Sequence, residues 1–219
     1  MIRRFDENAN RILDEIIEAR RTIRAFAKEA PSREEIEQLV RAGFLAPYAA
    51  LAVAGRSDFR RFVVLERGIP AHTEAARLVQ LLAKERLEKA HQARGRAPVE
   101  GERDYAYLSR LKMLAENGHP SLAAAPYYIV VAEYQGVPAA GLQSLAHVLE
   151  NMWLKATALG LAFQLISVTE AMAENEAFVR LLGLPFGEYV LDGCAVGYPA
   201  TDPPMAPRPD MSSGVRWLG

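Results

Sequence analysis

The residues between Leu142 and Gly160 carry the clearest helical pattern in the chain. Apolar side chains recur there at every third or fourth position, and Gly160 stands where a helix commonly ends. The apolar face consists of Leu142, Leu145, Leu149, Met152, Trp153, Ala156 and Leu159. Because this face is wide, we expect it to be buried against both a sheet and a second helix.

The strands of that sheet are predicted in four short apolar or β-branched runs bounded by Gly and Pro, at 61–66, 126–132, 161–166 and 189–196. Further helices are predicted at about 73–93, 105–116 and 174–182. Two more helices precede the first strand. The first is expected to bury Ile12, Leu13, Ile16 and Ile17 and to end near Arg20. The second begins at a capping box, Ser32 to Glu35, and is expected to bury Ile36, Leu39, Val40 and Phe44.

Composition narrows the class of function. The 26 basic and 27 acidic residues nearly cancel, so no overall field draws this chain to nucleic acid or to an anionic membrane. The single cysteine, Cys194, excludes an intramolecular disulfide and fits a reducing cytoplasm. The N-terminus has no apolar run of the secretory kind, and the longest uncharged apolar stretch, 42–55, is too short to span a bilayer. We therefore expect a soluble cytoplasmic protein with one domain over residues 1–219.

Several common chemistries lack their motifs. The sequence has no glycine-rich phosphate loop and no Gly-x-Ser-x-Gly elbow, so a bound nucleotide would be held by arginines and hydrolysis is disfavoured. The four histidines are scattered without metal-ligand spacing, and we expect all four to be solvated and no metal to be bound. Asp192 is either a paired buried carboxylate or, more commonly for such a position, one at an edge or facing solvent. Five prolines between 199 and 209 predict an extended tail that wraps its own domain or a neighbour.

Basic residues gather where the first helix is expected to end. Arg20 and Arg21 fall in its last turn, Thr22 adds a hydroxyl, and Arg24 follows. Guanidinium groups and a hydroxyl suit a phosphate. Cations are also favoured at a helix C-terminus by the helix dipole alone, so a solvated surface cluster is the alternative.

Taken in order, several local strings resemble the nitroreductase family of FMN enzymes. Residues 20–26 are similar to its opening Arg-Arg-Ser-x-Arg-x-Phe motif. The other similar strings are 32–47, which leads to an Ala-Pro, 125–131, 154–161, 181–185, and 197–199 followed by Arg208. Each string is weak alone, but their shared order across nearly the whole chain is specific.

The resemblance implies an α+β fold, a three-layer α/β/α sandwich with a mixed, mainly antiparallel central sheet, and an obligate homodimer with its active sites at the interface. It also implies FMN as cofactor and NADH or NADPH as electron donor. The residues expected at the cofactor are Arg20, Arg21, Thr22, Arg24, Pro47, Tyr48, Ser167, Val168, Thr169 and Arg208. Arg20, Thr22 and Arg208 would meet the phosphate, Arg24 the ribityl chain or the pyrimidine edge, and the backbone of 167–169 the central ring nitrogen.

One segment departs from the family pattern. Tyr48 stands where the family has serine, the following asparagine is missing, and Ala49, Ala50, Ala52 and Ala54 replace polar groups at the flavin edge. This apolar stretch is either dimer-interface packing or the wall of a substrate pocket. As a wall it would favour small apolar or planar acceptors, because a polar substrate would lose its hydrogen bonds to water there.

The sequence thus predicts an FMN-dependent oxidoreductase that passes electrons from a reduced nicotinamide to a small acceptor of nitroaromatic or quinone type. No catalytic side chain can be named, and protons are expected from water or from Tyr48. Two alternatives stay open: flavin fragmentation or reductive dehalogenation on the same fold, and a catalytically decayed flavin-binding sensor or interaction dimer.

Overall fold

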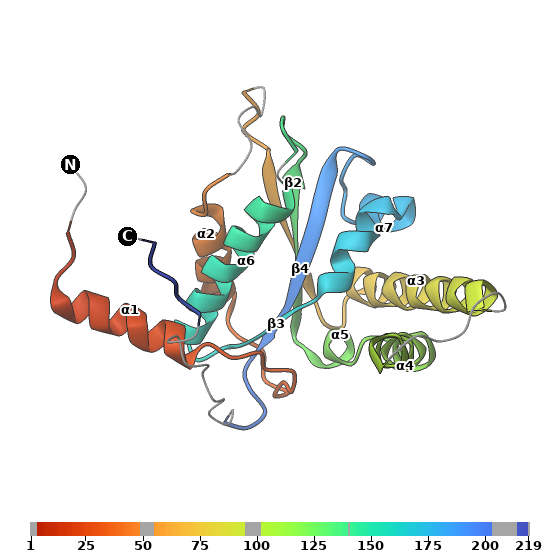
Figure 1. The fold of residues 1–219 in the computed structure, drawn as a ribbon, viewed down its shortest axis with the longest axis horizontal. Helices are drawn as coiled ribbons and strands as arrows, with labels where there is room; N and C mark the ends of the chain where they lie inside the picture. Colours follow the sequence, from red (N-terminus) through yellow and green to blue (C-terminus); the bar gives the residue numbers. More distant parts are fainter. Residues whose placement is uncertain (1–3, 49–54, 95–101, 140, 203–213, 219) are drawn as a thin grey trace.

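A four-stranded antiparallel sheet lies at the centre of the computed structural model, which describes residues 4–48, 55–94, 102–139, 141–202 and 214–218 (Figure 1). The strands are β1 (Arg60–Glu66), β2 (Tyr127–Tyr134), β3 (Ala162–Leu165) and β4 (Tyr189–Gly197), in the order β1-β2-β4-β3. All four were predicted from the sequence to within a few residues. Every strand pairing within the described ranges is antiparallel, so the expected mixed sheet is not found there.

Helices connect these strands. They are α1 (Glu7–Ala19), α2 (Arg33–Phe44), α3 (Pro70–Arg94), α4 (Glu102–Asn117), α5 (Pro120–Ala124), α6 (Gly141–Ala158), the 3-10 helix η1 (Ser167–Glu174) and α7 (Glu176–Leu181). The short α5 and η1 were not predicted, because neither is long enough to show a helical period. The helix expected at 174–182 is α7 alone, since η1 ends where it was expected to begin.

Both faces of the sheet are covered by helices. Along β2, Tyr127, Ile129 and Val131 pack with α2 and α6, whereas the alternate residues pack with α3, η1 and α7. Alternate side chains of a strand point to opposite faces, so β2 is buried on both. Most of the wide face of α6 is thus buried against the sheet and a second helix, as predicted, but Leu142 in its first turn is exposed. At Gly43 of α2 a Cβ atom would lie only 2.9 Å from Cγ of Met152, so the two helices approach too closely there for a larger residue.

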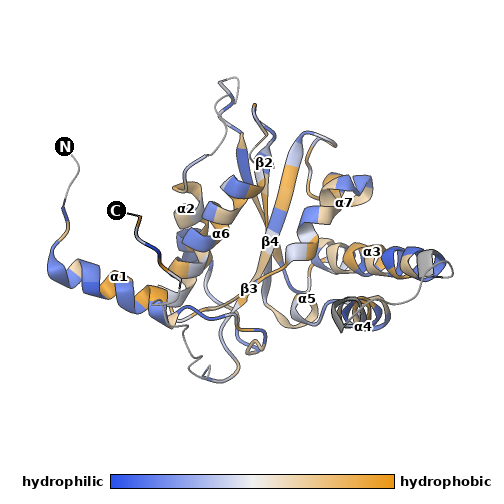
Figure 2. Cartoon of the chain, in the orientation of Figure 1, coloured by the Kyte–Doolittle hydropathy of each residue, from blue (hydrophilic) through white to orange (hydrophobic). Residues whose placement is uncertain are grey.

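The prediction that α1 is buried is wrong for a single chain. No residue of α1 is buried, and the side chains of Ile12, Leu13 and Ile17 are between 44% and 49% exposed. Figures 1 and 2 show α1 projecting from the body of the molecule with an apolar stripe along it. α1 contacts α6, but these side chains stay partly exposed in the single chain, which is a feature of surfaces that meet another molecule.

Smaller corrections concern other side chains. The capping box of α2 is confirmed in full, but Phe44 at the end of that helix is half exposed. β1 lies at an edge of the sheet, so Val64 is partly exposed. His72 and His119 are buried, against the expectation that all four histidines are solvated, because each lies at the start of a helix that packs on the domain. Among the helices of the described ranges, none has the length and apolar composition of a membrane-spanning segment.

Candidate cofactor site

Arg20 lies at the C-terminal end of α1 and is held against α6. Its guanidinium carbon is 4.6 Å from the ring centroid of Trp153, and its Nε lies 3.1 Å from a carboxylate oxygen of Glu150. Trp153 is fixed in turn, since it stacks on Phe163 of β3 and its indole N–H donates to the carbonyl of Arg21 at 3.0 Å. The side chain of Arg20 is therefore oriented before any ligand arrives.

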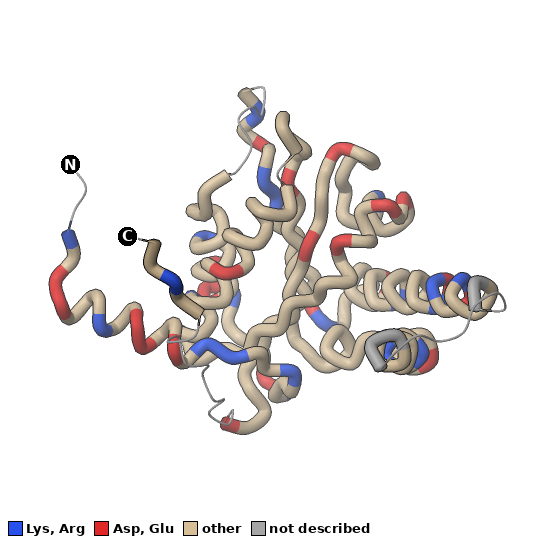
Figure 3. The backbone as a smooth tube through the Cα atoms, in the orientation of Figure 1, with Lys and Arg blue, Asp and Glu red and all other residues tan. Residues whose placement is uncertain are grey.

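The residues after Arg20 run along the edge strand β3. The amide of Ile23 donates to the carbonyl of Phe163 at 3.1 Å, and the side chains of Thr22 and Arg24 are exposed beside it. Arg21 instead donates to the carbonyls of Glu18 and Arg20 at the helix end. Figure 3 shows this basic stretch between α1 and the sheet. Arg20, Thr22 and Arg24 thus lie where they could bind an anion, whereas Arg21 supports the helix end.

The segment Ser167–Thr169 begins η1 directly after β3. Ser167 is exposed, whereas Thr169 is fully buried, with its hydroxyl 2.7 Å from the hydroxyl of Tyr128 and 2.6 Å from the carbonyl of Ile166. The side chain of Thr169 therefore anchors η1 and cannot reach a ligand. Since Phe163 and Ser167 are four residues apart in extended chain, the basic stretch and this backbone lie about 13 Å apart along one edge of the sheet.

Pro47 and Tyr48 lie elsewhere. The hydroxyl of Tyr48 donates to the carbonyl of Tyr134 at 2.8 Å, and its ring contacts Phe59 with centroids 4.8 Å apart. The carbonyl of Pro47 accepts from Ser144, in the first turn of α6. Trp153 is nine residues further along α6, or about 14 Å at the rise of a helix. One chain therefore does not bring these two residues to Arg20.

The environment of Tyr48 bears on its proposed role as a proton donor. Burial, with the negative charge of Glu133 as a second cause, raises the pKa of its phenol above the usual value. Its proton is engaged by the carbonyl of Tyr134. A phenol in this state holds its proton and is a poor donor near neutral pH.

Sequence reasoning missed a buried ion pair close to Pro47. Arg60, which is 3% exposed, begins β1, and Glu133, which is fully buried, stands opposite it near the end of β2. Their side chains are bonded to each other. Opposite charges in cross-strand register are a signal that only the strand pairing reveals, because 73 residues separate them in the chain.

Asp192 proves to lie on the central strand β4 and not at an edge. Its carboxylate accepts from the amide of Gly193 at 2.7 Å, and burial raises its pKa to about 6. β3 ends opposite Cys194, so Asp192 lies beside the point where the chain turns into η1. Cys194 itself is a buried core residue, as predicted, and burial raises the pKa of its thiol.

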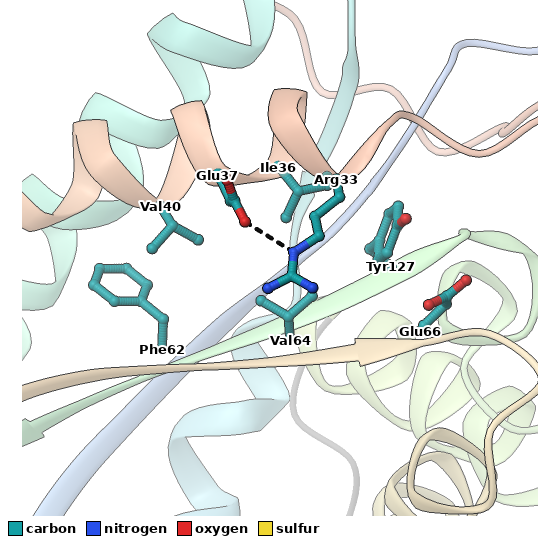
Figure 4. A pocket seen from close by; sticks show the side chains of 8 residues that line it. All are labelled: Arg33, Ile36, Glu37, Val40, Phe62, Val64, Glu66 and Tyr127. Carbon is teal, nitrogen blue, oxygen red and sulfur yellow. Dashed lines mark hydrogen bonds and ion pairs between the residues drawn. The ribbon is translucent and has the colours of Figure 1, made fainter.

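A groove of about 380 Å³ separates α2 from β1 (Figure 4). Its floor is apolar and its rim charged, and it is lined by Arg33, Ile36, Glu37, Val40, Phe62, Val64, Glu66 and Tyr127. Figure 4 shows the Arg33 side chain bonded to Glu37 and reaching across the opening. None of the predicted cofactor residues lines this groove.

Two parts of the predicted site lie outside the described residues. They are Arg208 and the alanines at 49, 50, 52 and 54. Among the residues that are described, no three His, Cys, Asp or Glu side chains are grouped so that they could hold a metal ion.

The chain was compared with known proteins. The model of the nitroreductase family matches residues 17–198. Similar solved structures include a nitroreductase with bound FMN from Bacteroides fragilis, at 19% identity and a TM-score of 0.69, covering 98% of this chain and 100% of that one. Another is an iodotyrosine deiodinase bound to FMN and 3-iodo-L-tyrosine, at 22% identity and a TM-score of 0.67, covering 94% and 99%.

A third similar structure is a BluB-like flavoprotein from Clostridium difficile, at 21% identity and a TM-score of 0.67, covering 94% of this chain and 99% of that one. No curated protein matches the chain. At these identities the structural matches establish a shared fold.

Proposed function

The chain belongs to the nitroreductase family, and from that premise we propose that it is an FMN-dependent oxidoreductase that passes electrons from NADH or NADPH to a small planar acceptor. The observation that supports this most is the arrangement along β3. Arg20, Thr22 and Arg24 lie beside one end of the strand and the exposed backbone at Ser167 follows the other. FMN could place its phosphate at the basic residues and its ring system at the backbone of Ser167.

The donor set fits the phosphate of FMN. A guanidinium offers paired N–H donors that match phosphate oxygens, and a hydroxyl adds one more. Arg20 is already oriented by Trp153 and Glu150, so less side-chain entropy is lost when it binds an anion. The exposed Arg24, further along the same stretch, is assigned to the ribityl chain or the pyrimidine edge.

When bound, the flavin supplies the hydride and electron transfer. The share of this chain is to bind and orient it. The start of η1 is anchored by the buried Thr169, whose amide donates to the carbonyl of Ile166 and whose hydroxyl meets that of Tyr128. This leaves the amides of Ser167 and Val168, which would donate toward the central ring nitrogen. Because the Tyr48 proton is engaged, we assign the proton that completes reduction to water.

We propose that the protein works as a homodimer. The two parts of the predicted site lie about 14 Å apart along α6, and a two-fold axis would bring Tyr48 of one chain to Arg20 of another. The partly exposed apolar stripe of α1 would be buried further in such a dimer. The first residues of the tail, Pro199 and Ala200, pair with Phe26 and Ala25 of the same chain, and we assign the later part of the tail to the partner, where Arg208 would close the phosphate site.

Cofactor analysis tests the proposal. The purified protein is expected to be yellow, to release FMN on denaturation, and to be bleached by NADH or NADPH without oxygen and recoloured by a quinone. A colourless protein that takes up no added FMN would overturn it in favour of a decayed scaffold. A flavin that nicotinamides do not reduce, but that after chemical reduction with dithionite removes iodide from 3-iodotyrosine and is itself reoxidised, would favour reductive dehalogenation instead.

A further inference from the structure

The side chain of Arg60 is the centre of a buried polar network between β1, α2 and α6. One nitrogen is bonded to Glu133, and another lies 3.3 Å from the hydroxyl of Ser144. The remaining contacts are to four backbone carbonyls, those of Gly43 at 3.2 Å, Phe44 at 3.0 Å, Ala46 at 2.7 Å and Pro47 at 3.2 Å. A single guanidinium therefore holds the end of α2 and the turn that follows it.

Two of these carbonyls accept from a second donor, that of Gly43 from the amide of Ala46 and that of Pro47 from the hydroxyl of Ser144, whereas those of Phe44 and Ala46 meet Arg60 at the end of the helix. The last carbonyls of a helix have no partner within it, and a cation at that end also meets the negative end of the helix dipole. The planar fork of Arg60 reaches several of them at once, which an ammonium could not do. Ala46 is buried, so its carbonyl depends on this contact and not on solvent.

The ion pair of Arg60 and Glu133 is weakly explained by a contribution to folding stability. The second carboxylate oxygen of Glu133 is buried and has no hydrogen-bond partner, so this ion pair is incompletely satisfied. Replacing such a pair by apolar residues of similar volume is often neutral or stabilising. Its remaining effect is to fix geometry, and the geometry that it fixes is that of the turn leading to Tyr48.

Tyr48 follows this turn directly. Beyond the carbonyl of Pro47 its ring packs on Phe59, which precedes Arg60, and its hydroxyl reaches Tyr134, which follows Glu133. The two charged residues thus lie next in sequence to both neighbours of Tyr48. A change in the Arg60 network would therefore reach Tyr48 by three routes: through the backbone of Pro47, through the ring of Phe59 and through the carbonyl of Tyr134.

We propose that Arg60, paired with Glu133, is a positioning residue that fixes Pro47 and Tyr48 at the flavin site of the dimer. This inference rests on the proposed function, in which those two residues line the site. Arg60 does not touch the ligand itself, and its effect passes through the backbone of 46–48. Small displacements of groups that line a reaction site can lower rates up to about 100-fold.

The test compares Arg60→Lys with Arg67→Lys in the flavin-loaded protein. Arg67 is a matched control, since it also donates to backbone carbonyls, those of Ala124 and Lys28, but beyond the other end of β1. We expect Arg60→Lys to lower kcat/KM for a quinone about tenfold and to shift the visible absorption spectrum of the bound flavin, because Tyr48 is displaced at its edge. We expect Arg67→Lys to change kcat/KM less than about twofold and to leave the spectrum unchanged. Repeating both substitutions in a Tyr48→Ala background separates positioning from general damage: there Arg60→Lys is expected to cost less than about twofold.

Equal effects of the two lysine variants, or an undiminished effect of Arg60→Lys without Tyr48, would overturn the inference while leaving the proposed function intact. A wild-type protein that binds no FMN would overturn the proposed function and this inference with it. If Arg60→Lys does not fold, the neutral pair Arg60→Gln with Glu133→Gln replaces it. That double variant removes the buried charges together, and the same Tyr48-dependent loss is expected.

Discussion

The guanidinium of Arg20 lies over the ring of Trp153, 4.6 Å from its centroid, and so joins the end of α1 to α6. Because Glu150 also holds this side chain, its direction is set by α6 and not by solvent. This contact makes Arg20 the arginine of the basic stretch whose loss should matter most to the binding of an anion.

Arg20→Ala is expected to weaken FMN binding by about 1.5 to 3 kcal/mol, the scale of a charge-assisted hydrogen bond. Riboflavin, which lacks the phosphate, should lose far less. Titration of the apoprotein with both ligands measures the difference. Arg11→Ala is the control, because Arg11 is an exposed arginine of the same helix that bonds Asn8 and Glu15. Equal losses for the two flavins would mean that Arg20 supports the fold instead.

Leu13→Asp is expected to split the proposed dimer, since it places a charge in the apolar stripe of α1, where the leucine is 49% exposed in the single chain. Light scattering should give a mass near the 24.2 kDa of one chain, with loss of bound flavin. Asn10→Asp adds the same charge to an exposed polar position of the helix and should leave the dimer whole. A Leu13→Asp protein that keeps twice the chain mass and its flavin would show that the stripe is not the interface.

Thr169→Val is expected to lower the free energy of unfolding by about 1 to 3 kcal/mol, because it leaves the buried hydroxyl of Tyr128 without its partner. The double variant with Tyr128→Phe removes both hydroxyls and should recover part of that loss. Urea denaturation of the wild type, the two single variants and the double variant completes a double-mutant cycle. Strictly additive losses would show that the two hydroxyls do not stabilise each other.

His119 should make the protein less stable in acid. Burial, with Arg110 as a second cause, lowers its pKa to about 4 from an ordinary value of 6.5. Between these values the unfolded chain binds a proton that the folded chain does not, so this contribution to stability is present above pH 6.5 and is lost as the pH falls towards 4. The loss is at most about 3 kcal/mol. The pKa of Asp192 is raised from 3.8 to about 6, so between these values its contribution to stability is lost as the pH rises, which is the opposite of the effect of His119.

Comparison with His119→Gln isolates the histidine from the carboxylates. The variant should show a shallower fall in stability between pH 6.5 and 4 when urea midpoints are followed across that range. His147→Gln, at an exposed position of α6, should follow the wild-type curve. Parallel curves for wild type and His119→Gln would show that His119 can be protonated in the folded state without cost.

The sequence was a good guide wherever a pattern is local. The capping box of Ser32 and Glu35, the face of α6 and all four strands depend on neighbours within a few residues, and each was found in the structure. The exposure of α1 could not be foreseen, because an amphipathic helix looks the same whether its apolar face meets its own chain or another.

The site was harder to predict for a related reason. The basic stretch after α1 is contiguous in sequence, but Arg60 and Glu133 come together only through the pairing of β1 with β2. The burial of the Thr169 side chain was equally hidden, since the expectation concerned only the backbone of 167–169 and the Thr169 hydroxyl meets that of Tyr128 from another strand. Long-range pairing, which periodicity does not report, decided both cases.

Arg20 and Pro47 lie about 14 Å apart along α6, and this separation has a genetic consequence if two chains build each site. A dimer of one Arg20→Ala chain and one Tyr48→Ala chain would carry both defects in one site and none in the other. Two impaired proteins, mixed and reassembled, would then regain about a quarter of the wild-type sites, since random pairing makes half of the dimers mixed. Two alleles could in this way complement each other within a cell, although each alone encodes an impaired enzyme.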